Sequence, residues 1–437
     1  MPPRRNKGGL LARVNFPLYT IQMLTSRHVL VGGGGGSSKT GVANGFEIFE
    51  LSHDGWNFIA EEVTRHETGP SVVMNCAAFN DGKKTWLVAG QESHCQLYNV
   101  IPRVVAVENG EVEAGINSNT KDNENSLRQR KLNEKKQDTT TKLGDEKFEN
   151  IRNNNSNAKH KKLQLILKPS TSIQTDFSES DPLQRIVRIS LNGKVMATGG
   201  LDGVVRLWKF PQLTKIHDLK THIKEIDDID FNINCDYVAT IAKDGRALVW
   251  DVVKGTKYKE LSWVPPNGAK YVYKRLRFRI PNEKKSKIQL YILSNATSSK
   301  NPSYLQLWDV EQGLIIKSAP CKETLSAIAV SDDGKFVAVG TMFSGSIDIY
   351  VAFSLQKALH ISGAHSMFVT GLEFLPTKLD GPAITSNSET AVVSISVDNR
   401  ICIHSIPFRH ALPFWLVILF IILSICGAFM FCSYMGI

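Results

Sequence analysis

The chain has 437 residues, with 52 lysines and arginines against 42 aspartates and glutamates, so its formal net charge is +10. That length accommodates two or three average domains or one large β architecture. The seven cysteines are scattered without a C-x-x-C pair or a disulfide-like rhythm, which argues against a disulfide-stapled secreted domain and a cysteine-based metal cluster.

The first unusual stretch is GGGGGSSKTGVANG, which runs from Gly32 to Gly45 between the strand-like segments RHVLV and GFEIFEL. A phosphate-binding loop requires a glycine directly before its Lys-Ser/Thr pair and a helix after it. Here Ser38 precedes Lys39, and the residues that follow have the alternation of a strand. The stretch is therefore not expected to bind a nucleotide directly.

Between two strands, the same stretch forms an unusually long hairpin connection, because such loops usually take two to five residues. Its five consecutive glycines, Gly32 to Gly36, indicate backbone geometry that side chains would block. A tolerated surface insertion is the alternative, but a neutral insertion would drift toward mixed polar composition. The composition therefore favours a function for this loop.

Self-similarity runs through most of the chain. ISLNGKVMATGGLDGVVRLWKF, at Ile189 to Phe210, is echoed by IDFNINCDYVATIAKDGRALVWDV, at Ile229 to Val252, and weaker copies bring the number of units to about seven. Repeats of roughly 40 to 45 residues, each with four short strands and a Trp-Asp ending, are the signature of WD40 propeller blades. We predict an all-β fold, a seven-bladed WD40 β-propeller with a C-terminal transmembrane helix.

One segment does not fit a blade. From about Glu108 to Lys162 the chain is rich in Asn, Lys and Glu and poor in apolar residues. Such a segment cannot bury enough surface to order itself, so residues 108–162 are predicted to be a disordered insertion after the second unit. Blades 1 and 2, including the loop at 32–45, are then expected in 1–107, and blades 3 to 7 in 163–407.

Polar residues within the repeats are interpreted as structural. His222 with Asp228, and His365 before the last unit, stand where a blade's polar network is often found. The positive charge is spread over the N-terminus and the repeats, whereas a nucleic-acid reader concentrates it on one face. Nucleic acid is therefore disfavoured as a partner, and an anionic membrane surface or an acidic protein is favoured.

The segment from Ala411 to Ile437 has no charged residue. It exceeds the ~20 residues that cross a hydrocarbon core, so 411–437 is predicted to be a transmembrane anchor. Arg409 and His410 flank only its upstream side, which predicts that the preceding residues face the cytosol. In that orientation the glycosylation sequon at Asn295 stays unmodified.

The loop LVGGGGGSSKTGVANGFEIFEL in the first unit, the seven units and the single C-terminal span together resemble the prolactin regulatory element-binding protein family. Members of that family are exchange factors of the endoplasmic-reticulum membrane. They load GTP onto a Sar-type small GTPase and so start COPII coat assembly. The resemblance implies the same role here, with a cytosolic propeller and no catalytic residues of its own.

In that family the loop is the exchange element, and a potassium ion bound largely through backbone oxygens holds its shape. The resemblance assigns Gly33 to Gly36 to the shaped backbone and Ser37 to Asn44 to a protruding part. The implied GTPase contacts are Gly36, Ser37, Ser38, Lys39, Thr40, Gly41, Val42, Ala43 and Asn44. The implied potassium ligands are Gly33, Gly34, Gly35 and Asn44.

Two other classes of function stay open. A membrane-tethered scaffold without exchange activity is one, because propellers commonly bind peptides at their rims. A DNA-binding transcriptional regulator is the other, although a membrane anchor and the lack of a groove-sized basic element disfavour it. A measurement of nucleotide release separates these hypotheses.

Overall fold

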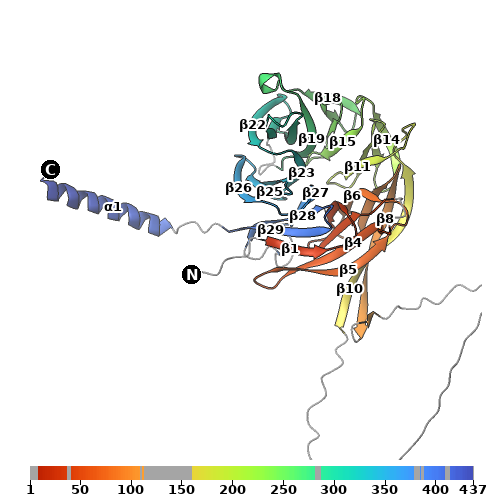
Figure 1. Ribbon diagram of the computed structural model, residues 1–437, viewed down its shortest axis with the longest axis horizontal. Coiled ribbons are helices and arrows are strands. Elements are labelled where there is room, and N and C mark those ends of the chain that lie inside the picture. Colours follow the sequence, from red (N-terminus) through yellow and green to blue (C-terminus); the bar gives the residue numbers. More distant parts are fainter. Residues whose placement is uncertain are drawn as a thin grey trace, which may run out of the picture. The chain divides into compact units, whose positions relative to one another are not determined.

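The computed structural model describes residues 8–36, 41–108, 111–112, 160–280, 287–377, 384, 388–408 and 414–436. By internal contacts the chain divides into two units, Met1–Ile101 with Leu165–Ile437, and Pro102–Gln164. In the described residues the strands form seven sheets, which confirms the predicted seven-bladed β-propeller (Figure 1).

The first four blades, each given from the innermost strand outward, follow the chain. Blade 1 is β2 (Leu18–Met23), β3 (His28–Gly33), β4 (Gly45–His53) and β5 (Phe58–Glu67). Blade 2 is β6 (Val73–Asn80), β7 (Thr85–Gln91), β8 (His94–Glu108) and β10 (His160–Gln174), with the short β9 (Glu111–Val112) beside β8. Blade 3 is β11 (Gln184–Ile189), β12 (Val195–Gly200), β13 (Val205–Lys209) and β14 (Thr214–Leu219). Blade 4 is β15 (Ile226–Phe231), β16 (Tyr237–Ala242), β17 (Ala247–Asp251) and β18 (Thr256–Leu261).

The remaining three blades complete the ring. After a short 3-10 turn at Pro266–Gly268, blade 5 is β19 (Tyr271–Phe278), β20 (Gln289–Ala296), β21 (Ser303–Asp309) and β22 (Leu314–Cys321). Blade 6 is β23 (Leu325–Val330), β24 (Phe336–Thr341), β25 (Ile347–Val351) and β26 (Gln356–Ile361). Blade 7 is β27 (Val369–Phe374), β28 (Ser388–Ser396), β29 (Arg400–Pro407) and, as its outer strand, β1 (Gly8–Arg13).

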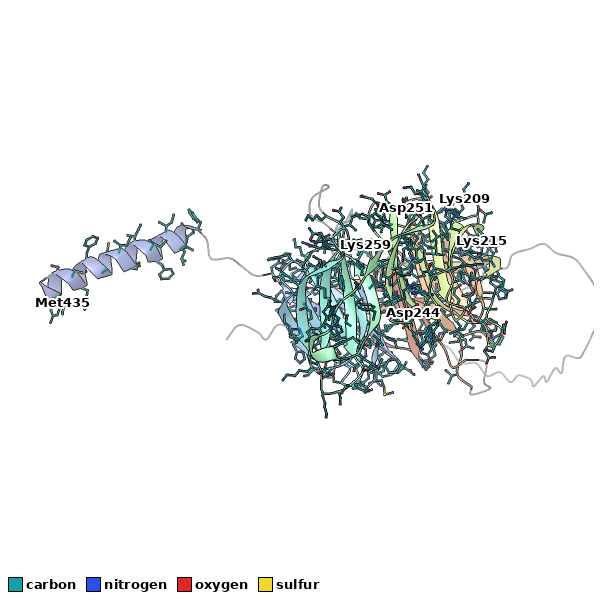
Figure 2. All side chains as sticks on the ribbon, turned by 90° about the horizontal axis from the view of Figure 1, so that it is seen from above. Lys209, Lys215, Asp244, Asp251, Lys259 and Met435 are labelled. Atoms are coloured by element: carbon teal, nitrogen blue, oxygen red, sulfur yellow. The ribbon has the colours of Figure 1, made fainter. Side chains whose placement is uncertain are left out.

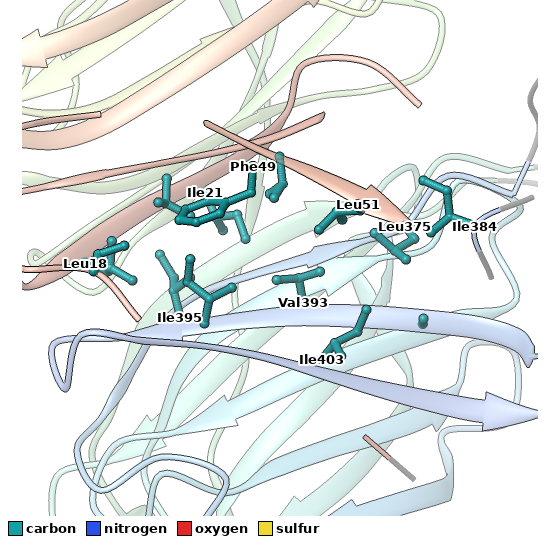
Figure 3. Packing of buried hydrophobic residues seen from close by; sticks show 14 of the residues in the cluster. Leu18, Ile21, Phe49, Leu51, Leu375, Ile384, Val393, Ile395 and Ile403 are labelled. Atoms are coloured by element: carbon teal, nitrogen blue, oxygen red, sulfur yellow. The ribbon is translucent and has the colours of Figure 1, made fainter. Parts of the chain in front are cut away.

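Blade 7 closes the ring by combining strands from both ends of the propeller sequence. β1 pairs antiparallel with β29, from Gly8 opposite His404 to Arg13 opposite Arg400. Apolar side chains of blade 1 pack against those of blade 7 in one buried cluster (Figure 3), which includes Leu18, Ile21, Phe49, Leu51, Leu375, Ile384, Val393, Ile395 and Ile403. β1 covers the edge of β29, and the shared cluster joins blade 1 to blade 7, so closure stabilises the ring as a whole.

The insertion divides blade 2 and does not follow it. β10, the fourth strand of that blade, lies beyond the insertion and ends at Gln174, and blade 3 begins only at Gln184. The predicted start of blade 3 at residue 163 is therefore wrong, because β8 and β10 are far apart in the chain and their pairing has no local signal. Residues 113–159, the interior of the predicted insertion, lie outside the described residues.

A four-residue polar network stabilises blade 4. His222 contacts Asp244 through Nδ1 at 3.0 Å and Thr240 through Nε2 at 2.9 Å, and the Trp250 indole donates to the same Thr240 hydroxyl at 2.9 Å. Burial lowers the pKa of the His222 imidazole, although Asp244 acts to raise it. The structural role predicted for His222 fits this network, but its partner is Asp244 and not Asp228, as the sequence analysis had paired it.

The propeller has two faces that the strand registers define. Gly33, at the end of β3, lies opposite Leu18, and the Thr370 hydroxyl donates to the Leu18 carbonyl oxygen at 2.8 Å, so β2 and β27 begin at the same face. We call this the loop face. β28 ends at this face, with Ser396 opposite Val369, and begins at the opposite face with Ser388. Ser388 lies opposite Pro407, so β29 ends at that opposite face, here called the exit face. Asp251 and Asp244 lie at opposite ends of the β16–β17 hairpin. Figure 2 shows Asp251 at one edge of the propeller and Asp244 away from that edge.

One helix of the described chain is long and apolar enough to cross a membrane. It is α1 (Phe414–Met435), with 22 residues, a mean hydropathy of 2.7 and no residue buried within the protein. A soluble core helix would bury one of its sides, whereas a helix that is apolar all round suits a hydrocarbon environment. The helix lies within the segment 411–437 predicted to be the anchor.

Candidate functional site

The Gly-rich loop connects β3 and β4 of blade 1 on the loop face. Gly33 and Gly45 lie opposite each other as the last pair of the β3–β4 ladder, and the loop leaves the sheet between them. The structure describes Gly34 to Gly36 and Gly41 to Asn44; Ser37, Ser38, Lys39 and Thr40 lie outside the described residues. The predicted position, between the second and third strands of the first blade, is therefore confirmed.

Asn44 holds the two ends of the loop together. Its Oδ1 accepts the Gly36 N–H at 2.9 Å, and its Nδ2 donates to the carbonyl oxygens of Gly36 and Gly69 at 3.0 Å each. The Asn44 carbonyl oxygen also accepts the Thr68 N–H at 3.0 Å. The residue is only 5% exposed, so these bonds are protected from water. Asn44 therefore acts as a clamp at the base of the loop.

Three glycines at this base have no room for a side chain. A Cβ on Gly33 would lie 1.9 Å from the Pro17 carbonyl oxygen, and one on Gly45 would lie 2.2 Å from the His66 carbonyl oxygen. A Cβ on Gly34 would lie 2.1 Å from Asn44 Oδ1, and Gly34 has a φ of +143°. Glycine is required here by close approach as well as by backbone conformation.

The upper part of the loop uses glycine differently. Gly36 and Gly41 have φ values of +88° and +76°, but a Cβ on either would meet no atom within 4 Å. Glycine is favoured at these two positions by conformation alone. The glycine-rich composition thus combines a tightly packed base with a turn that opens to solvent.

The structure shortens the part of the loop that can protrude. The predicted protruding part runs from Ser37 to Asn44, but Asn44 is buried, and the half-buried Val42 packs against the cluster between blades 7 and 1. Within the described residues only Gly41 and Ala43 of this stretch are exposed. The clamp could not be found from the sequence, because Asn44 contacts Gly69 from the next connection of the chain.

The base of the loop rests on a small aromatic group between blades 1 and 2. Phe46 and Tyr98 meet edge to face with ring centroids 5.7 Å apart, and His66 meets the same tyrosine at 5.5 Å. Burial lowers the pKa of His66. On β4, next to Phe46, the buried Glu47 forms an ion pair with Arg65 of β5 at 2.9 Å. These contacts fix the start of β4 and so support the clamp.

The chemistry available at the loop is that of oxygen atoms and N–H groups. No described residue donates a hydrogen bond to the carbonyl oxygens of Gly34 and Gly35. Among the described residues no group of three or more His, Cys, Asp or Glu side chains could hold a metal ion. A cation at this loop would therefore depend on neutral oxygens, which the base of the loop presents.

Comparison with known proteins gives matches over part and over nearly all of the chain. The family model of the WD domain, G-beta repeat, matches residues 177–209 and 213–251, which cover blade 3 and the first three strands of blade 4. The chain is 31% identical over 424 residues to the guanine nucleotide-exchange factor SEC12 of Mus musculus, with 95% of this chain and 94% of the relative covered. The SEC12 protein of Rattus norvegicus gives 31% over 425 residues with the same coverage. The SEC12-like protein 1 of Arabidopsis thaliana is 27% identical over 214 residues, or 47% of this chain and 49% of the relative.

Proposed function

The chain belongs to the SEC12 family of guanine nucleotide-exchange factors, and from this premise we propose that its clamped Gly-rich loop acts on a Sar-type small GTPase. The protein is a guanine nucleotide-exchange factor with a WD-repeat propeller and a C-terminal helix for membrane association. By loading GTP onto that GTPase it would start COPII coat assembly.

The Asn44 clamp is the observation that carries the assignment to the loop. A loop that is held at its base before binding loses less conformational entropy when a partner docks on it. The base also contains glycines whose side-chain positions are filled by other atoms. Gly36 and Asn44, between which Lys39 stands in the sequence, are thereby held at fixed positions on the loop face.

Exchange by such a loop follows from differential binding. A protein that binds the nucleotide-free or rearranged switch state of a GTPase more tightly lowers the nucleotide affinity by the same factor. No proton transfer or nucleophile takes part, so the blades need no catalytic residues. In this scheme Lys39 pairs with an acidic residue of the switch region, while Gly36 and Gly41 allow the backbone to approach closely.

The test is nucleotide release from a purified Sar-type GTPase. The full chain in detergent micelles is expected to accelerate the release of fluorescent GDP at least about tenfold, which corresponds to an activation free energy of release lower by about 1.4 kcal/mol. A GTPase of another class is the control, because the loop should discriminate between switch sequences. A chain that binds the Sar-type GTPase without accelerating release would be a scaffold, and the exchange assignment would be wrong.

We further propose that a potassium ion binds at the base of the loop. The carbonyl oxygens of Gly33, Gly34 and Gly35, with the side-chain oxygen of Asn44, would hold it, since hard cations take oxygen ligands. The ion would supply positive charge that keeps these oxygens turned toward one another.

Exchanging potassium for lithium is expected to lower the melting temperature of the full chain. The same exchange should make the loop more susceptible to protease cleavage. Sodium chloride at equal ionic strength separates a specific ion from general screening. Equal stability and equal cleavage in all three salts would exclude the site.

The propeller is proposed to face the cytosol from the endoplasmic-reticulum membrane. Arg409 and His410 lie on the propeller side of the apolar segment, and such charges remain on the cytosolic side. Protease added to sealed microsomes should therefore digest the propeller completely, and Asn295 should carry no glycan. Detergent-opened microsomes are the control for protease activity. A protected propeller would show the opposite orientation.

A further inference from the structure

The axis of the propeller contains a channel that the exchange function does not use. Its cavity has a volume of about 370 Å³ and is lined by the innermost strand of each of the seven blades. Five of the lining residues are arginines, namely Arg185, Arg188, Arg275, Arg277 and Arg279, and three are carboxylates, namely Asp228, Asp230 and Glu373. A central channel with more guanidinium groups than carboxylates is a candidate binding site for an anion.

The charges are arranged by strand. Arg275 and Arg277 stand two residues apart on β19, and Arg279 follows directly after the strand. Because side chains two residues apart on a strand point to the same side, the three arginines face the same way. Asp228 and Asp230 alternate in the same way along β15 of the preceding blade. The acidic strand of blade 4 thus lies between basic strands of blades 3 and 5.

Part of the positive charge is already paired. Asp228 lies 2.7 Å from Arg277 and 3.8 Å from Arg188, and it also accepts the Leu276 N–H at 3.1 Å. Arg185 contacts Glu225 at 2.6 Å and Asp227 at 3.0 Å. These arginines have a structural explanation.

Arg275 and Arg279 differ from these three, although Arg275 lies near enough to Asp228 to oppose the rise that burial causes in the pKa of that carboxyl group. Within the described residues neither makes an ion pair. Arg275 donates to the main-chain oxygen of Asp227 at 2.9 Å and to that of Lys274 at 3.3 Å. Arg279 contacts the Gln289 side-chain oxygen, and its buried Nε has no hydrogen-bond partner. A guanidinium group remains charged when it is buried, so an uncompensated one is costly.

The nearby carboxylates compensate this charge only in part. Burial raises the pKa of Asp230 and that of Glu373 to about 7, against the opposing effect of Arg188 on both. Asp230 accepts the Phe278 N–H at 2.8 Å, whereas Glu373 receives no hydrogen bond from the described residues. Among the lining residues the guanidinium groups therefore outnumber the carboxylates.

We propose that the axial channel binds a small, multiply charged phosphate-bearing anion, with Arg275 and Arg279 as its principal donors. Planar guanidinium groups bind phosphate oxygens through two parallel N–H bonds, and these two have donors to spare. The cavity volume falls within the range of small-molecule sites. The phosphates could belong to a free compound or to a lipid headgroup that reaches a mouth of the channel.

The experiment is titration calorimetry on the full chain in detergent micelles. The probes are pyrophosphate, inositol hexakisphosphate and a water-soluble dioctanoyl phosphatidylinositol bisphosphate, with dioctanoyl phosphatidylcholine as the uncharged-headgroup comparison. We expect binding of at least one phosphate probe and about a tenfold weaker affinity in each of Arg275→Gln and Arg279→Gln, because each removes a charge-assisted contact. Arg13→Gln is the matched control, since Arg13 is exposed on the outer strand of blade 7.

The outcomes distinguish a soluble ligand, a lipid headgroup and the absence of a site. Binding of the free anions alone identifies a soluble ligand, and binding of the phosphoinositide alone identifies a lipid headgroup; both support the site. Arg275→Lys and Arg279→Lys, which keep the charge and the fold, should lose only part of the affinity. No binding by any probe, or equal weakening by Arg13→Gln, would overturn the proposal. The readout does not involve a GTPase, so it is independent of the exchange function.

Discussion

Replacing Ser37 to Gly41 with two glycines is expected to reduce GDP release from the Sar-type GTPase to its intrinsic rate while the propeller stays folded. The replaced residues lie between the two ends that Asn44 joins, and neither Val42 nor Asn44 is removed. Shortening a loop by a few residues changes its closure entropy by less than about 1 kcal/mol, so the melting temperature should hardly change. Stopped-flow fluorescence for release and circular dichroism for melting measure the two effects separately.

The control is a smaller replacement in the corresponding connection of another blade on the same face. The connection between β20 and β21 also leaves blade 5 on the loop face, and its exposed Ser298 to Lys300 can be replaced by two glycines. This variant should exchange at the rate of the natural chain. If the blade 1 variant retained full exchange activity, the loop would not be the exchange element and the remaining surface of the loop face would have to contain it.

Gly34→Val is expected to abolish most of the exchange activity. The substitution should act by disrupting the Asn44 clamp, and not by removing a residue that contacts the GTPase. A Cβ at this position would lie 2.1 Å from Asn44 Oδ1, and β-branched side chains rarely adopt a φ of +143°. The strain is expected to cost roughly 1–3 kcal/mol, either as lost stability or as an opened loop. Release assays and protease cleavage within the loop should therefore change together.

Two glycine substitutions calibrate this effect. Gly9 lies on β1, and a Cβ added to it would meet no atom within 4 Å, so Gly9→Ala should have no effect on exchange or stability. Gly36→Ala meets no atom within 4 Å but keeps a strained φ of +88°, so its effect should be intermediate. If Gly34→Val exchanged as fast as Gly9→Ala, the shaped base would not be required for function.

The blades could be predicted because their signals are local. Asp202-Gly203 and Asp244-Gly245 mark the turns of blades 3 and 4, and both glycines have positive φ values near +71° and +81°. Alternating apolar residues on either side of such turns specify strands that face a core. Repetition of this pattern was sufficient to predict the propeller and the number of its units. The anchor helix was equally local, because length and apolarity alone define it.

Contacts between distant residues were not predicted, because several candidates had the same local character. Asp228 and Asp244 both follow His222 closely in the sequence, yet only Asp244 lies at the turn that faces the histidine. Asp228 points into the channel and pairs with Arg277, which lies 49 residues further along the chain. The pairing of β1 with β29 and that of β8 with β10 across the insertion are likewise set by closure of the ring.

At the candidate site, the sequence alone determined that the loop between β3 and β4 is rich in glycine and lacks the glycine that a phosphate-binding loop has directly before its Lys-Ser/Thr pair. The tertiary structure decided why each glycine is there, because the atoms that exclude a side chain from Gly33, Gly34 and Gly45 come from Pro17, Asn44 and His66. The tertiary structure also decided that Asn44 is a buried clamp, because the pairing of β4 with β5 brings its partner Gly69 next to it. Backbone conformation is encoded locally, whereas close packing depends on which segments the fold brings together.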